Sequence, residues 1–169
     1  MTIKTIYEQL NDEICDNVSL LIKTEKINFE ILKTVLSGYL KYIGYEKDAK
    51  LLHLDQNINP VGITNDKYFE ERISCLVQDN NGFWYMGFLL EFYKKYSDKD
   101  IIEPTDSTII GVKENNGSFQ LKLLNTDKTY DTSKPEELVK FYEKIVEEIK
   151  SDFSLNLILK NKVAKKIGF

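Results

Sequence analysis

Two Asn-Asn-Gly tripeptides constrain the fold of this chain more than any other feature of its sequence. One stands at 80–82, between the apolar segments FEERISCLVQD and GFWYMGFLLEFY, and the other at 115–117, between STIIGVKE and SFQLKLL. Asn and Gly tolerate the positive φ angles of a tight hairpin turn, so each tripeptide predicts a β-hairpin. With a weaker strand, AKLLHLD, at 49–55, they predict an antiparallel β-meander of four to five strands, mainly over 69–124.

The segment before this sheet has the periodicity of helices. Apolar residues recur every three or four positions from Ile3 to Ile22 and again from Ile31 to Ile43, and each stripe is typical of an amphipathic helix. Asn28 has the side chain of a helix N-cap, and Gly44 is suited to the left-handed position that ends a helix. We therefore expect two helices that form a helical hairpin over 3–44.

The segment after the sheet is also helical. The tetrapeptide SKPE at 133–136 combines a capping residue with a proline in the first turn, and it predicts C-terminal helices over 134–168. With 42% hydrophobic and 30% charged residues, the composition is that of a globular protein. We expect a single α+β domain of residues 1–169 with helices packed on the sheet, the C-terminal helices on one of its faces.

Charge is unevenly distributed along the chain. Residues 155–169 contain four lysines and no acid, so the formal net charge of −4 divides into +4 there and −8 over 1–154, where 19 bases face 27 acids. An acidic body makes nucleic acid an unlikely partner and favours a protein partner. We expect the basic tail to dock as a helix, with binding to an anionic membrane or nucleic acid as the alternative.

The sequence also bears on compartment and chemistry. Acids interrupt the first twenty residues, and the longest apolar stretch, at 83–90, is shorter than the roughly 20 residues that cross a bilayer. We therefore expect a cytoplasmic protein without transmembrane insertion. His53 is the only histidine and no common nucleotide-binding or hydrolase motif is present, so we expect no metal site and no cofactor.

One hairpin resembles the catalytic hairpin of the PD-(D/E)xK nucleases. Pro104-Thr105-Asp106 precedes one strand, and Gln120-Leu121-Lys122 lies in the next. The resemblance implies that Asp106 helps to bind Mg²⁺ and that Lys122 orients the attacking water, but Gln120 stands where the family has an acid. The alternative interpretation is an ordinary hairpin with polar residues on its solvated face.

The hairpin around the first Asn-Asn-Gly turn is crowded with aromatic residues. Strand alternation predicts that Trp84, Phe88 and Phe92 face the core. It predicts an exposed partner-binding face that contains the remaining tyrosines and a neighbouring acid: Tyr85, Tyr93, Tyr96 and Glu91.

In general organisation, the segment GFWYMGFLLEFYKKY, the strand SFQLKLL and the helix SKPEELVKFYEKIVEEI resemble the small α+β immunity proteins of bacterial polymorphic toxin systems. This resemblance implies a non-enzymatic inhibitor that neutralises a cognate toxin, with a basic toxin domain as its partner. A phage-encoded inhibitor of a host defence protein, the nuclease or a degenerate relative of it, and a homodimeric structural domain are the alternatives.

Overall fold

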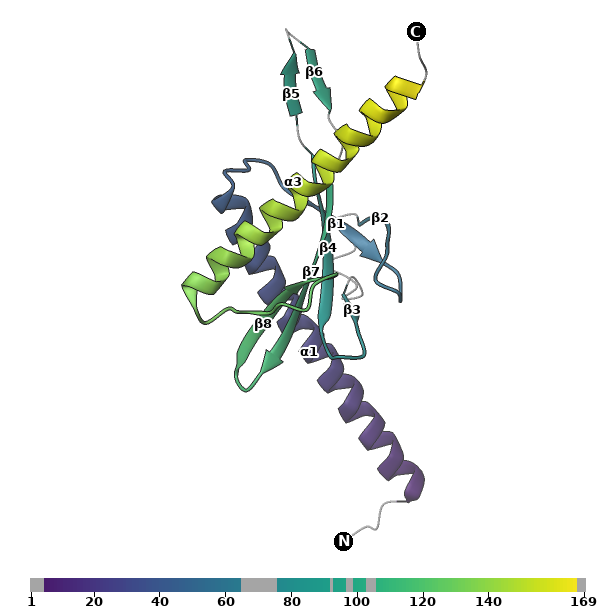
Figure 1. The fold of residues 1–169 in the computed structure, drawn as a ribbon. Helices are drawn as coiled ribbons and strands as arrows, with labels where there is room; N and C mark the ends of the chain where they lie inside the picture. Colours follow the sequence, from purple (N-terminus) through teal and green to yellow (C-terminus); the bar gives the residue numbers. More distant parts are fainter. Residues whose placement is uncertain (1–4, 65–75, 92, 97–98, 103–105, 167–169) are drawn as a thin grey trace.

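The computed structural model describes residues 5–64, 76–91, 93–96, 99–102 and 106–166. A long N-terminal helix is followed by β-strands and a long C-terminal helix (Figure 1), an α+β arrangement as predicted. The elements are α1 (Ile6–Tyr42), β1 (Lys50–Leu54), β2 (Pro60–Ile63), β3 (Val77–Gln78), β4 (Trp84–Leu90), β5 (Tyr93–Tyr96), β6 (Lys99–Ile102), β7 (Asp106–Asn115), β8 (Ser118–Leu123), β9 (Tyr130–Asp131) and α3 (Pro135–Lys166).

Most strands form one antiparallel sheet in the order β2-β1-β4-β7-β8-β9, and β3 also pairs with β4. The strand predicted at 49–55 is present as β1, and the sheet is wider than predicted because it also includes β2 and β9. Strands β5 and β6 follow β4 and precede β7 along the chain, and they pair with each other as a separate two-stranded sheet.

Both predicted hairpin turns are confirmed. In the β7–β8 hairpin, Asn115 pairs with Ser118, and the two residues between them, Asn116 and Gly117, have φ angles of 52° and 83°. This is the left-handed geometry that Asn-Gly supplies at little cost. In the β3–β4 turn, Gly82 has a φ angle of 82°. The paired part of β3 is only two residues long, and β1 occupies the edge of β4 farther along, where Leu51 pairs with Phe88.

The predicted helical hairpin over 3–44 is wrong, because residues 6–42 form one continuous helix. The segment from 6 to 37 contains neither Gly nor Pro, so nothing in its backbone chemistry interrupts the helix. Asn28 does not act as a cap. Its side-chain amide donates a hydrogen bond to the carbonyl oxygen of Thr24, one turn earlier, at 2.9 Å. The end of the helix was predicted correctly, since Gly44 has a φ angle of 67°.

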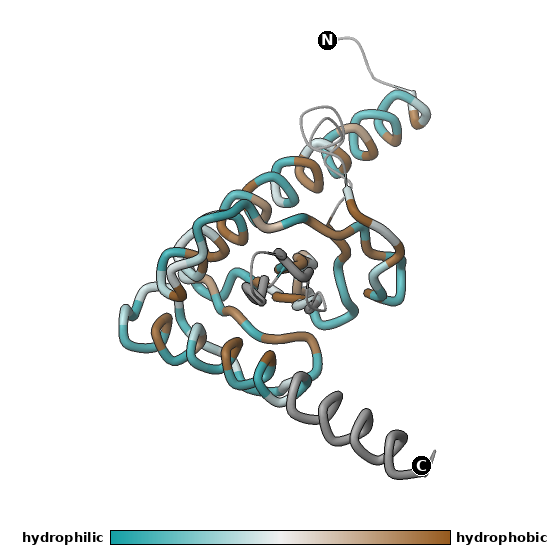
Figure 2. The backbone as a smooth tube through the Cα atoms, turned by 90° about the horizontal axis from the view of Figure 1, so that it is seen from above, coloured by the Kyte–Doolittle hydropathy of each residue, from teal (hydrophilic) through white to brown (hydrophobic). Residues whose placement is uncertain are grey.

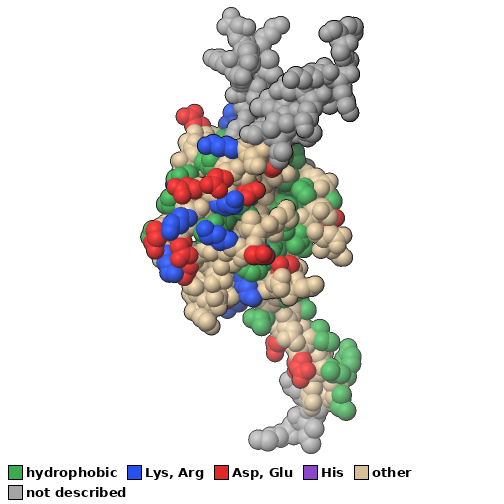
Figure 3. Space-filling model, in the orientation of Figure 1, with side chains coloured by type: hydrophobic (Ala, Val, Ile, Leu, Met, Phe, Trp, Pro, Cys, Tyr) green, Lys and Arg blue, Asp and Glu red, His purple; other side chains and the backbone are tan. Residues whose placement is uncertain are grey.

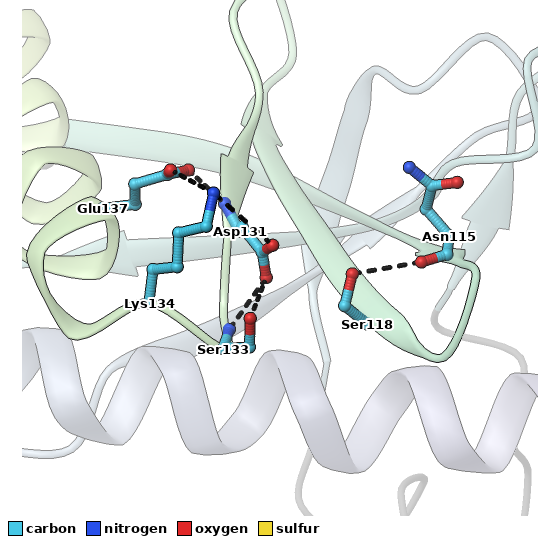
Figure 4. A network of polar contacts seen from close by, with 6 residues as sticks. All are labelled: Asn115, Ser118, Asp131, Ser133, Lys134 and Glu137. Carbon is cyan, nitrogen blue, oxygen red and sulfur yellow. Dashed lines mark hydrogen bonds and ion pairs between the residues drawn. The ribbon is translucent and has the colours of Figure 1, made fainter.

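The C-terminal segment is likewise one helix, α3, where more than one was predicted. A polar network holds its start against β9 (Figure 4). The Asp131 carboxylate accepts hydrogen bonds from the backbone N–H and hydroxyl of Ser133, and the Glu137 carboxylate accepts one from the backbone N–H of Asp131. Lys134 pairs with Glu137 at 3.0 Å. These contacts lower the pKa of Asp131, chiefly through Ser133, and that of Glu137, chiefly through the Asp131 N–H.

The main core lies between the sheet and the two helices, which pack on the same face of the sheet (Figure 2). The prediction of core positions for Trp84 and Phe88 is confirmed, since both are buried in this cluster. The helices also contact each other. The rings of Tyr39 and Tyr142 lie 5.8 Å apart, and the Tyr142 hydroxyl donates to the carbonyl oxygen of Val35 at 3.2 Å. These contacts fix the second half of α1 and leave its first half outside the core.

Candidate functional site

The first half of α1 extends away from the sheet and from α3 (Figure 1). Every residue from 6 to 22 is exposed, whereas the buried residues of this helix all lie between Asn28 and Tyr39. We call residues 6–22 the free half of α1 and residues 28–42 the docked half. Both halves belong to one continuous helix, so they differ in what covers their side chains.

Large apolar side chains form a stripe along the free half. The stripe residues and their exposed fractions are Tyr7 77%, Leu10 52%, Ile14 61%, Val18 50% and Leu21 52%, with Ile6 at 78% and Ile22 at 47% beside them. Tyr7, Ile14 and Leu21 recur every seven residues, and the same spacing leads to the buried Asn28 and Val35. Residues spaced by seven lie along nearly one line of a helix. The core-facing side of the docked half therefore continues, uncovered, along the free half.

The free half is also acidic. Residues 6–22 contain four acids, Glu8, Asp12, Glu13 and Asp16, and no base. Figure 3 shows acidic and hydrophobic side chains together on the projecting helix. The first bases that follow are Lys23 and Lys26. The free half therefore presents an apolar stripe on one side of the helix and negative charge on the remaining sides.

A complete cap stabilises the start of the free half. The Thr5 hydroxyl accepts a hydrogen bond from the backbone N–H of Glu8, and the Glu8 carboxylate accepts one from the backbone N–H of Thr5 at 2.7 Å. This reciprocal pair satisfies two backbone donors that a helix otherwise leaves open. The hydrogen bond from the Thr5 N–H lowers the pKa of Glu8. Because the docked half already supplies the helical nucleus, the free half extends the helix without packing of its own.

The opposite face of the sheet carries a polar cluster around Tyr85. The Tyr85 hydroxyl donates to Asp79 at 2.9 Å, and the same carboxylate accepts the backbone N–H groups of Asn81 and Phe83. Lys122 lies 3.9 Å from the Asp79 carboxylate, with its ammonium 4.6 Å from the centre of the Phe83 ring. Burial, and then the bond to Asp79, raise the pKa of Tyr85. Burial alone would raise the pKa of Asp79, but its hydrogen bonds hold it below the ordinary value.

This cluster changes the interpretation of two candidate residues. The prediction that Tyr85 is exposed is wrong, because its side chain is 1% exposed and its hydroxyl is satisfied by Asp79. Lys122 is also largely buried, with 14% of its side chain exposed. Its carboxylate partner, Asp79, was not among the residues that the sequence singled out. The only local indication was an aspartate directly before an Asn-Asn-Gly turn, a position that aspartate favours.

The three nuclease candidates are not gathered at one place along the sheet. Lys122 pairs with Gly111 and Gln120 with Lys113, so both lie near the turn of the β7–β8 hairpin. Asp106 pairs with Leu90 at the other end of β7, five residues from Gly111. At about 3.3 Å per residue, its backbone is roughly 17 Å along the strand from the partner of Lys122. The side chain of Asp106 lies outside the described part, and a nuclease role for these residues stays a prediction.

A small polar recess opens beside the first residues of β7. It has a volume of about 150 Å³ and is lined by hydroxyl, amide and carboxylate side chains that include Ser107, Asn125, Glu148 and Asp152. Glu148 pairs with Lys144 at 2.8 Å. Nowhere in the described ranges do three His, Cys, Asp or Glu residues gather in a group that could hold a metal ion.

The other predicted partner-binding residues lie at the end of β4 and in β5. Glu91 forms an ion pair with Lys50, and its backbone N–H and carbonyl both bond the Tyr45 hydroxyl at 3.2 Å. Tyr93 and Tyr96 begin and end β5, and their side chains lie outside the described part. Their role as binding residues stays a prediction.

Comparison with known proteins gave no match: no family model, no curated protein and no solved structure is similar to this chain. Within the described ranges, neither helix contains a stretch apolar enough to cross a membrane, and this agrees with the prediction of no transmembrane insertion. The candidate functional site therefore rests on the geometry of the free half of α1, which sequence reasoning had assigned to a packed helical hairpin.

Proposed function

We propose that this chain is a non-enzymatic protein-binding inhibitor whose partner docks on the free half of α1. The proposal rests chiefly on one observation, the exposed apolar stripe from Tyr7 to Leu21 on a helix whose residues 6–22 are all exposed. Isolated apolar residues on a surface are ordinary, but a contiguous row of them marks an interaction site. An amphipathic helix presented in this way fits the groove of a partner protein.

The chemistry of the free half specifies the partner further. An apolar groove would receive the stripe, and basic residues on the rim of that groove would face Glu8, Asp12, Glu13 and Asp16. Opposite charges on two rims accelerate association and disfavour partners of the wrong charge. A toxin that acts on nucleic acid has such a basic surface, because it must attract phosphate. We therefore propose that the chain is an immunity protein that neutralises a basic toxin domain.

A phage-encoded inhibitor of a host defence protein would use the same surface, so identification of the partner distinguishes these two roles. The test begins with a tagged copy of the full chain, expressed in its native host and recovered with its stoichiometric partner. Co-expression of that partner with and without the chain then measures neutralisation. A partner that is toxic alone and harmless with the chain supports the immunity role.

Two lysine substitutions locate the binding surface. Ile14→Lys places a charge in the centre of the stripe, and Ser19→Lys adds the same charge elsewhere on the free half, away from the stripe. We expect Ile14→Lys to weaken partner binding by about 30-fold or more, as for a central interface residue, and Ser19→Lys to change it by less than about threefold. Equal binding of the partner by wild type and Ile14→Lys would contradict the proposal. Because Ile14 is 61% exposed, both variants should keep the melting temperature of the wild type in dilute solution.

A further inference from the structure

A second copy of the same chain can also bind the stripe on the free half. We infer that, without its protein partner, the free half of α1 pairs with the free half of a second copy in antiparallel orientation. This inference rests on the proposed function, because it concerns the same surface. It states that a second copy covers the stripe while no protein partner is bound. A partner that binds the stripe would then take the place of the second copy.

The area of the stripe is sufficient for such a pair. Besides Leu20, which lies off the stripe, seven large apolar residues from Ile6 to Ile22 are about half or more exposed. At roughly 100 Å² each they present on the order of 700 Å², close to the approximately 800 Å² that each partner contributes to a standard specific interface. Residues 6–22 form about 25 Å of helix at 1.5 Å per residue, so several layers of side chains would meet along the pair.

The pattern of charge along α1 selects the antiparallel orientation. The acids of the free half are followed by Lys23 and Lys26. In an antiparallel pair centred near Asp16 and Asn17, Glu8 lies opposite residues 23–26 of the second copy, where Lys23 and Lys26 flank Glu25 and leave one net positive charge. This happens twice by symmetry. In a parallel pair, all four acids would lie beside their own counterparts, and like charges would oppose association.

The shape of the chain favours the same orientation. The sheet and α3 lie at one end of α1 (Figure 1), so an antiparallel pair places the two bodies at opposite ends of the paired helices. The resulting contact is isologous and closed, since the same residues contribute from both copies. A lipid surface is a poor alternative occupant, because residues 6–22 carry four acids and no base and anionic lipids would repel them.

The first experiment is sedimentation equilibrium of the full chain alone over a hundredfold dilution series. We expect wild type and Ser19→Lys to approach twice the chain mass of 19.7 kDa at high concentration and to dissociate on dilution. Ile14→Lys should sediment as a monomer at every concentration, with unchanged circular dichroism. A monomeric wild type throughout the series, or a dimer that Ile14→Lys leaves intact, would overturn the inference.

The second experiment measures orientation with spin labels in a Cys75→Ser background. One sample is labelled at the exposed Cys15, near the centre of the pair, and the other at position 9 in a Gln9→Cys, Cys15→Ser variant. An antiparallel pair predicts a label separation at position 9 that exceeds the separation at position 15 by about 20 Å along the helix axis. Similar separations at the two positions would indicate a parallel pair and overturn the proposed orientation.

These experiments use the chain without any partner, so the two proposals fail separately. A monomer that still binds and neutralises a toxin through Ile14 overturns the resting pair and supports the proposed function. A dimer that depends on Ile14 supports the antiparallel pair. This holds even if a recovered partner binds the Ile14→Lys variant as well as wild type, a result that contradicts the proposed function.

Discussion

The two halves of α1 have the same kind of sequence and opposite surroundings. In the docked half, Leu32 and Tyr39 are at most 1% exposed, whereas in the free half Leu10 and Ile14 are more than half exposed. The apolar side of one half continues into the other, and no Gly or Pro separates them. Apolar periodicity therefore identifies the side of a helix that seeks a partner, but it does not say whether the same chain supplies that partner.

The largest expected difference between the halves is in the effect of truncating a leucine. Leu32→Ala creates a cavity in the core and should reduce the free energy of unfolding by about 2–5 kcal/mol. Leu10→Ala removes an exposed side chain and should change it by less than about 0.5 kcal/mol in dilute solution. Urea unfolding measures both. Similar losses for the two variants would show that the free half is packed against the body of the monomer.

The next prediction compares two glycines, one inside the packed sheet and one on its open edge. A Cβ at Gly111 would lie 2.6 Å from the Tyr85 ring, while a Cβ at Gly62 would meet nothing within 4 Å. We expect Gly111→Ala to lower the free energy of unfolding by about 1–3 kcal/mol through overpacking. Gly62→Ala should stay within about 0.5 kcal/mol of wild type in the same thermal or urea unfolding experiment. Equal tolerance at the two sites would contradict the described packing of Tyr85.

Asn28 stands where the stripe becomes buried, and it offers a test of that boundary. Its side chain is 3% exposed, and its carbonyl oxygen has no hydrogen-bond partner. Replacement with the similarly shaped leucine removes this unsatisfied group, so Asn28→Leu should raise the free energy of unfolding by about 1 kcal/mol. Asn17→Leu, at an exposed position of the free half, is the matched control and should leave it nearly unchanged. A loss of stability in Asn28→Leu would mean that the amide is needed there.

The smallest expected effect is a pH dependence confined to the start of the free half. The Thr5 N–H lowers the pKa of Glu8 in the folded helix. The ionised Glu8 therefore stabilises the start of the helix fully at pH values above the ordinary pKa of glutamate. This stabilisation is lost as the pH falls through the lowered pKa of Glu8. Amide hydrogen exchange, corrected for its intrinsic pH dependence, should show fraying of residues 6–12 in acid before the docked half responds. Glu8→Ala, which removes the acceptor for the Thr5 N–H, should show the fraying already at neutral pH, and an unchanged exchange pattern in that variant would contradict the role of the cap.

The hairpins were predictable because they depend on local turn chemistry. The wrong predictions concern residues whose environment depends on packing between distant parts of the chain. Asn-Gly turns depend on two adjacent residues, and so the β7–β8 turn was found from the sequence. Tyr85 was misassigned because alternation separates the two faces of β4 but does not reveal that both are covered. Lys122 and Asp79 are 43 positions apart, and no local pattern connects them. Asn28 was taken for a cap because asparagine favours that position and no local pattern shows that the helix continues through it.

The central claim is that the free half of α1 is an interaction surface, and concentration-dependent hydrogen exchange tests it most directly. Backbone amides of residues 6–22 and 28–42 would be followed in one sample of the full chain at low and at high concentration. We predict that protection of residues 6–22 rises with concentration, while protection of residues 28–42 stays constant and high. Strong protection of both halves at the lowest concentration would contradict the account, because the stripe would then already be covered within the monomer.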